Sequence, residues 1–227
     1  MGDSHTKSST NWLEEPELPS AEEILSSSSP LLLPIQNESI TSKSEYLEKH
    51  YRMQRYEAVE PTRLAVSEFR QAPDMPERDL AYVYTDVHVQ GIVLTAQGAA
   101  TRVSFATDRA AATPIDWANP SRLQQGSLVV LSPVADHFKS KCYVATVAYR
   151  FLAGGLLPDL DADPPEPENT PSRVDLFFST WGGELLDPNI TFYMLEAKDG
   201  YFESVRHTMV ALRTAAFEKY VATPSLT

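Results

Sequence analysis

The sequence predicts an α+β fold, in which a small closed or partly open antiparallel β-barrel of about six or seven strands is flanked by an N-terminal helix pair and a C-terminal helix. Three observations predict it. Apolar residues recur at helical spacing in residues 42–72, follow strand patterns in residues 80–198, and return to helical spacing in residues 200–219. Short strands separated by turns commonly close into a barrel, because closure leaves no exposed strand edge.

The N-terminal segment, residues 1–41, is rich in Ser, Pro and Glu and includes the run Ser26–Ser29. Such a composition buries too little apolar surface to offset the entropy of ordering, so we expect a mostly disordered tail. Within it, Ser20 is followed three residues later by Glu23, the pattern of a capping box. This pattern favours a short, transient helical turn over Pro19–Leu25.

A helix pair is predicted for residues 42–72. Ser44 is the expected N-cap, and side chains suited to one helix face follow at Tyr46, Leu47, His50, Tyr51 and Met53. Pro61 interrupts the pattern. It either kinks one long helix or occupies the first position of a second helix, since proline lacks the N–H that a helix interior uses.

The barrel is predicted over residues 80–198. Alternating or continuous apolar runs indicate strands, and pairs such as Gln97-Gly98 mark turns between them. The expected strands include Thr101–Phe105, Leu128–Leu131, Cys142–Arg150, Arg173–Ser179 and Ile190–Lys198. Between Cys142–Arg150 and Arg173–Ser179, the stretch Pro158–Pro171 combines five acidic residues with several prolines and predicts an exposed, extended loop.

A last helix is expected over residues 200–219. Its apolar side chains recur three and four residues apart, which is typical of core packing: Phe202, Val205, Met209, Leu212 and Ala216. We therefore expect one helix–barrel–helix domain over residues 42–219, followed by a second tail at 220–227.

Composition narrows the class of protein. The apolar fraction of 42 % is enough for a sizeable core, whereas the net charge of −12 argues against a surface that wraps a polyphosphate as a whole. This charge does not exclude a local basic groove. The single cysteine excludes an intrachain disulfide and a cysteine zinc cluster. No apolar stretch is long enough to span a membrane, so we expect no membrane partner and an intracellular protein, nuclear or cytoplasmic.

Sequence motifs for catalysis are missing. The chain contains no phosphate-binding GxxxxGK[ST] loop, no HExxH zinc motif and no GxSxG nucleophile elbow. We therefore expect no catalytic residue, no cofactor and no metal ligand, and hence no enzyme. A minor alternative, a small-molecule enzyme using carboxylates in the barrel mouth, would require carboxyl groups with strongly shifted pKa values in a concave pocket.

One loop is a candidate for contact with RNA. An aromatic residue beside two lysines can stack on a base and approach phosphates, and Phe138, Lys139 and Lys141 have this arrangement. Arg150, at the far end of the next strand, is added to the candidate set. The alternative interpretation is an ordinary polar hairpin turn.

Four stretches resemble a known family. The stretch Tyr46–Arg52 with Pro61 resembles the opening helix of the NFX-type zinc-finger-containing RNA helicases, relatives of the Upf-like superfamily-one helicases. Gly126–Ser132 and Tyr143–Val147 are similar to that family's strand pair before the motor, and Tyr201–His207 is similar to the helix that follows. The order and spacing agree from about residue 40 to residue 217.

This resemblance implies a unit like the stalk and regulatory barrel of Upf-like helicases, in which the barrel lies over the RNA channel and the stalk connects it to the first motor lobe. It also implies partners from RNA silencing, including RNA-dependent RNA polymerase and Argonaute machinery, and the motor lobes themselves if the chain is longer. The resemblance ends before the family's ATP-binding motif. Helicase activity is therefore not expected of these residues.

Two functional hypotheses follow. In the first, the chain is a non-catalytic N-terminal regulatory or accessory domain of an RNA-silencing helicase that positions RNA or partner proteins. In the second, it is a stand-alone protein-interaction module without RNA binding, which the acidic composition favours. Salt dependence separates them, because phosphate binding weakens steeply as salt rises and an apolar protein interface does not.

Overall fold

The computed structural model describes residues 11–27, 40, 42–74, 76–77, 79–110, 115–118, 121–200 and 202–218. Three α-helices, six strands and one short 3-10 helix occur in this part of the chain. In chain order they are α1 (Ala21–Leu25), α2 (Lys43–Gln71), β1 (Ala81–Thr95), β2 (Gly98–Ala106), β3 (Leu128–Pro133), β4 (Tyr143–Tyr149), β5 (Ser172–Phe178), η1 (Gly183–Leu186), β6 (Phe192–Ala197) and α3 (Phe202–Phe217).

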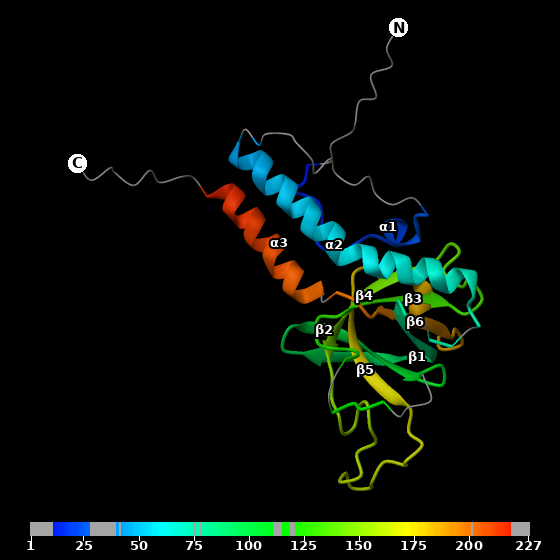
Figure 1. Cartoon of the computed structure of the whole chain (residues 1–227). Coiled ribbons are helices and arrows are strands. Elements are labelled where there is room, and N and C mark those ends of the chain that lie inside the picture. The colour runs from blue at the N-terminus through cyan, green and yellow to red at the C-terminus, as the bar shows by residue number, and fades with distance from the viewer. Residues whose placement is uncertain are drawn as a thin grey trace.

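The strands form a closed antiparallel barrel in the order β1-β2-β5-β4-β3-β6, with β6 pairing back to β1 (Figure 1). The predicted fold class is confirmed, since the barrel is closed and helices precede and follow it. Strand β1 pairs with both β6 and β2, and its register shifts between Thr85 and His88. The extra residues of this bulge include Asp86 at φ 46°, and such bulges bend a strand so that a sheet can curve into a barrel.

Helix α2 runs without a break through Pro61. Of the two expected arrangements, a single long helix is therefore the observed one, and Figure 1 shows it bending part-way along its length. Proline has no N–H to donate to the preceding turn, which accounts for a bend at this place. The N-cap is Ser42, whose side chain accepts from the Glu45 N–H at 3.2 Å. This corrects the expected cap at Ser44, which lies inside the first turn.

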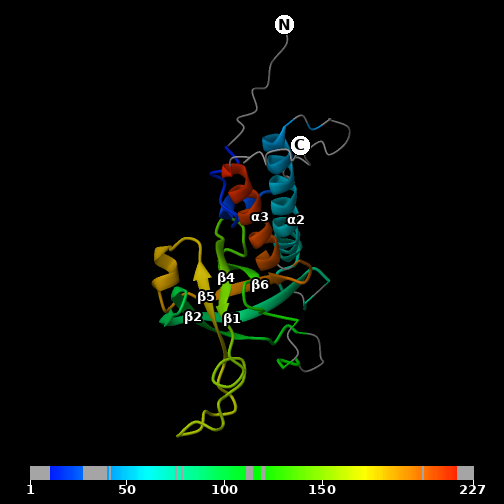
Figure 2. The ribbon, with the colours of Figure 1, turned by 90° about the vertical axis from the view of Figure 1, so that its left-hand side faces the viewer.

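Helix α3 lies antiparallel to the first part of α2 (Figures 1 and 2). The Lys43 side chain, at the start of α2, donates to the Glu218 carbonyl just beyond the end of α3, at 3.3 Å. We call α2 and α3 together the stalk. The predicted apolar stripe of α3 faces inward, because Phe202 and Met209 are buried and Val205 is packed against the same cluster.

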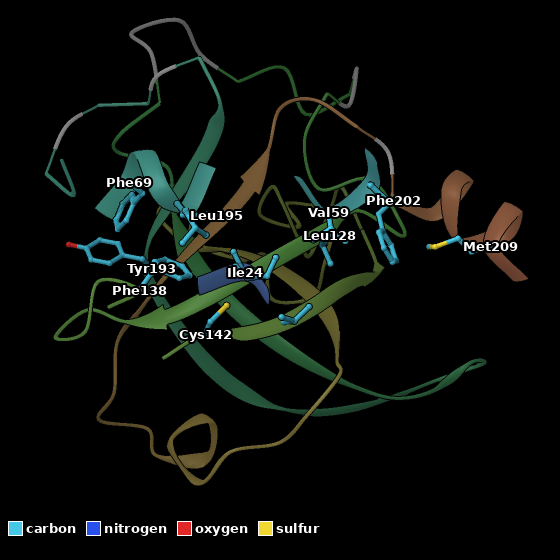
Figure 3. Close-up of a cluster of buried hydrophobic side chains, with 14 of the residues drawn as sticks. Ile24, Val59, Phe69, Leu128, Phe138, Cys142, Tyr193, Leu195, Phe202 and Met209 are labelled. Carbon is cyan, nitrogen blue, oxygen red and sulfur yellow. The ribbon is translucent and has the colours of Figure 1, made fainter. Parts of the chain in front are cut away.

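Two apolar cores share the barrel wall. One fills the barrel interior with side chains from every strand, such as Phe105, Leu131 and Met194. The other lies between α2 and the outer face of β3, β4 and β6, and its members include Phe69, Phe138 and Leu195 (Figure 3). Strand β3 contributes to both cores and is buried along its whole length. The helices are therefore part of the same folded unit as the barrel.

Replacing Met209 by Asp tests the packing of the stalk. The side chain is fully buried, so an unpaired carboxylate there should lower the free energy of unfolding by about 3 kcal/mol or more. The matched control is Val210→Asp on the same helix, where the side chain is 41 % exposed and we expect a change within about 0.5 kcal/mol. Urea denaturation followed by circular dichroism measures both. Equal midpoints for Met209→Asp and wild type would contradict this placement of α3.

Candidate interaction surfaces

The predicted RNA-contacting loop does not present its aromatic ring. Phe138 is fully buried and packs edge-on against Phe69 of α2, with ring centroids 5.7 Å apart (Figure 3). Its backbone has φ 57°, and its N–H donates to Ser132 Oγ at 2.9 Å. The carboxylate of Asp136 accepts from the Lys141 N–H at 2.8 Å, which keeps the turn tight and the ring inside. The expectation that Phe138 stacks on a base is corrected accordingly.

The three basic candidates do not form one patch. Lys139 is exposed, and Lys141 forms an ion pair with Glu184. Arg150 lies beyond the other end of β4, where its guanidinium donates to the Trp117 carbonyl. A strand advances about 3.3 Å per residue, so the two lysines and Arg150 are separated by most of the barrel's height. An RNA-contacting role for the lysines stays a prediction.

Basic side chains elsewhere on the barrel are paired with the chain's own carboxylates. Arg102 contacts Asp175 at 2.8 Å, and Arg122 contacts Glu77 at 2.7 Å. A guanidinium already bound to a carboxylate contributes little free positive charge toward a phosphate. The described surface therefore offers little unpaired positive charge, on which nucleic-acid binding depends.

One buried carboxyl group has a strongly shifted pKa. Glu196 points into the end of the barrel, where it accepts from the Tyr84 hydroxyl at 2.8 Å and from the Leu123 N–H at 2.9 Å. Burial raises the pKa of Glu196 to about 7. The adjoining cavity measures only about 10 Å³, barely room for one water and too little for a substrate. Glu196 therefore ties the 122–127 segment to the barrel, and its surroundings do not support an active site.

The single cysteine is a buried packing residue. Cys142 is buried in the core between α2 and the barrel, and burial raises the pKa of its thiol to about 12. A protonated thiol is a poor nucleophile, so its role is packing. Within the described ranges, no group of three or more His, Cys, Asp or Glu side chains is arranged to hold a metal ion. In the same part of the chain, the structure contains no helix with the length and apolarity to cross a membrane.

A cleft of about 490 Å³ lies where the stalk meets the barrel. Its charged groups, Glu203 and Arg206, bind each other at 2.6 Å. The remaining lining is neutral: Leu18, Gln97, Gln125, Gly126, Thr146, Val147 and Phe177. This cleft has the volume for a side chain or a small ligand, but its lining offers no nucleophile paired with a base.

An exposed apolar patch lies on the loop between β4 and β5. Its members are large side chains that are 42–59 % exposed: Tyr149, Phe151, Leu152, Leu157 and Leu160. We call them the loop patch. The rings of Tyr149 and Phe151 lie 4.4 Å apart, and the Leu157 N–H donates to the Leu152 carbonyl at 2.8 Å. The loop extends from the barrel on the side away from the stalk (Figures 1 and 2).

Acidic side chains follow the loop patch along the chain. The predicted extended loop is exposed over most of its length and carries Asp159, Asp161, Asp163, Glu166 and Glu168. Glu166 is bound by Arg173 at 2.6 Å, and Arg173 also donates to the Gly154 carbonyl at 2.9 Å, which fixes the base of the loop. The sequence did not reveal this surface, since apolar residues directly after a strand are more often buried than exposed. The combination of exposed apolar and acidic groups is typical of a protein-binding surface.

The barrel matches a known protein family. The ZNFX1 domain family matches residues 77–198, which are 122 of the 227 residues. The chain belongs to the ZNFX1 domain family. The matched residues coincide with the barrel, from Glu77, the partner of Arg122, to the end of β6. This membership confirms the resemblance to NFX-type zinc-finger-containing RNA helicases.

A curated relative of this ZNFX1 domain extends the comparison to the stalk. The "Helicase required for RNAi-mediated heterochromatin assembly 1" of Schizosaccharomyces pombe is 32 % identical over 212 residues, which make up 92 % of this chain. The chain spans 19 % of that relative's length. No solved structure matches the chain.

The buried Glu196 gives the ZNFX1 domain a specific pH dependence. Its folded-state pKa of about 7 lies above the ordinary value of 4.5, so the folded protein binds this proton more tightly than the unfolded chain. Its contribution to stability is therefore fully present below pH 4.5 and is lost as the pH rises to about 7.

Glu196→Gln removes this titration. Between pH 4.5 and 7 we expect the wild type to lose up to about 3 kcal/mol relative to the variant, measured as the difference between their urea unfolding free energies. Parallel pH profiles for the two proteins would show that Glu196 does not titrate in this range.

Proposed function

We propose that this ZNFX1 domain is a non-catalytic accessory module of an RNA-silencing helicase, and that it holds a protein partner at the end of the barrel away from the stalk. The similarity to a helicase named for RNAi-mediated heterochromatin assembly supports the setting. The loop patch is the observation that carries the proposal, because its five exposed apolar side chains adjoin a stretch of the chain that carries five carboxylates.

The stalk suits a contact with the rest of such a helicase. The most exposed residues of α3 carry no Lys, Arg, Asp or Glu, and the partly exposed Arg206 is paired with Glu203. These exposed residues are Ser204, His207, Thr208, Val210, Ala211, Thr214 and Phe217. A helix that faces only water normally presents charged side chains on that side. The uncharged face, with Phe217 71 % exposed, is therefore suited to packing against another protein surface, such as a motor lobe.

The chemistry of the loop patch defines the partner. Large apolar side chains supply the contact area, and the acidic side chains around them favour a segment with Lys or Arg interspersed among apolar residues. RNA is disfavoured at this surface because its phosphates would meet carboxylates. From the family resemblance, RNA-dependent RNA polymerase and Argonaute are the partners to test first.

The test compares a double variant of the loop patch with a single control substitution at another exposed apolar residue. Phe151→Ser with Leu157→Ser removes two members of the loop patch, and Leu94→Ser removes an 89 % exposed leucine from the hairpin between β1 and β2. We expect the first variant to bind purified RNA-dependent RNA polymerase or Argonaute at least about tenfold more weakly than wild type, and the second to bind like wild type. Isothermal titration calorimetry measures both, and circular dichroism checks the fold. Unchanged affinity of the double variant for a partner that binds wild type would overturn the proposal.

A separate double variant tests the alternative that the domain binds RNA. Lys139→Glu with Lys141→Glu should weaken any RNA binding that uses this loop and reduce its salt slope by about 2, without loss of folding, because neither ammonium is buried. Fluorescence anisotropy with a labelled single-stranded RNA measures this. Under our proposal the wild type binds RNA weakly and the charge reversal changes little. Tight, steeply salt-dependent binding that the double variant loses would favour RNA instead.

A further inference from the structure

The N-terminal residues 11–27, which we call the strap, are held against the stalk and barrel. This corrects the expectation of disorder for that part of the predicted tail; residues 1–10, 28–39 and 41 lie outside the described residues. Trp12 is buried with its ring 5.4 Å from that of Tyr51, and Ile24 is completely buried. Figure 3 shows Ile24 among side chains of the barrel's outer face, including Leu128 and Cys142. Two apolar anchors thus fix the strap at its two ends.

Side chains of the stalk bind the main chain of the strap between these anchors and just beyond Ile24. The Tyr51 hydroxyl donates to the Glu15 carbonyl at 2.7 Å, and Arg55 donates to the Pro16 carbonyl at 2.9 Å. Further along α2, Arg63 donates to the Ser26 carbonyl at 3.1 Å and Arg70 to the Leu25 carbonyl at 3.0 Å. The strap adds no strand to the barrel. It is therefore bound in the manner of a peptide, by donors that hold its carbonyl groups and pockets that hold its side chains.

Carboxylates of the strap form ion pairs with arginines of both stalk helices. Glu23 accepts from Arg55 through both oxygens, one at 2.8 Å, and Glu17 binds Arg213 at 2.6 Å. The predicted capping box is present, since the Glu23 N–H donates to Ser20 Oγ at 3.2 Å and the Ser20 N–H donates to Glu23 at 2.7 Å. The box shapes the turn that presents Ile24. The groove consequently selects an acidic segment with a tryptophan, a capped turn and an aliphatic residue at defined spacing.

We propose that the groove between α2, α3 and the outer face of the barrel is a peptide-binding site, which the strap fills in cis and from which an acidic segment of a second protein with the same pattern displaces it. The strap's carboxylates are partly exposed, 21 % at Glu15 and 38 % at Glu23, so salt and competing acids have access to its ion pairs. Exchange uncovers the arginines and the apolar pockets together. This site is distinct from the loop patch, so either proposal can fail without the other.

The experiment uses the full chain with a site-specific protease sequence inserted between Asn37 and Glu38. After cleavage the strap is held only by its contacts, and a fluorescent peptide with the sequence of residues 11–27 competes for the groove. We expect the cleaved chain to bind the peptide, and the uncleaved chain to bind it at least about a hundredfold more weakly, because a tethered strap acts at an effective concentration near the millimolar range. Fluorescence anisotropy and gel filtration measure exchange.

Peptide variants supply the controls. Glu23→Gln removes the partner of Arg55 and Trp12→Ala removes an anchor, so each should weaken binding about tenfold or more. Glu14→Gln alters an exposed side chain whose bond is to Asn11 within the strap, and should bind like the parent peptide. Equal affinity of all three peptides would overturn the proposal.

Three further outcomes would also overturn it. Failure of the cleaved strap to exchange with excess peptide over days would make it an integral part of the fold. Loss of the folded barrel when the fragment leaves, seen by circular dichroism, would lead to the same conclusion. Release of the strap by single-stranded RNA but not by the acidic peptide would identify the arginines as a polyanion site instead.

Discussion

The apolar outer face of β3, β4 and β6 sets the architecture of the molecule. A closed barrel usually buries its interior and exposes its exterior. In these three strands, however, the side chains that point outward are apolar as well as those that point inward. Burial of such a surface contributes about 25 cal/mol per Å², so the outer face requires a cover. Helix α2 supplies it with Phe69, whose ring contacts both Phe138 and Tyr193. The position of the stalk on the barrel follows from this contact.

The basic side chains of the molecule are largely bound by its own acidic and carbonyl groups. The chain carries 19 basic and 31 acidic residues, and the described arginines of the stalk and barrel bind carboxylates or carbonyls of the chain itself. The loop between β4 and β5 carries five of the acidic residues, and exposed apolar side chains accompany them there. The two ends of the molecule therefore differ in character. The stalk end carries an uncharged helix face, and the loop end carries an acidic and apolar one.

Local patterns predicted the elements, because each depends on neighbours in the chain. The stripe of α3 and the strand alternation at Thr101–Phe105 are periodic, and Pro61 marked the bend of α2. The burial of Phe138 was not predictable, because it depends on packing against Phe69, which is far away in the sequence. The strap was missed for a related reason. Its composition is that of a disordered segment, and Trp12 and Ile24 order it only because the folded stalk and barrel provide their pockets.

We propose that a protein partner meets the loop end of this ZNFX1 domain and not the loop that carries Lys139 and Lys141. Hydrogen–deuterium exchange of this domain, with and without a purified protein that binds it, distinguishes the two surfaces. We expect slower exchange of backbone amides in residues 149–160 when the partner binds, with no change in residues 136–141. Protection confined to residues 136–141, appearing on addition of RNA alone, would contradict it.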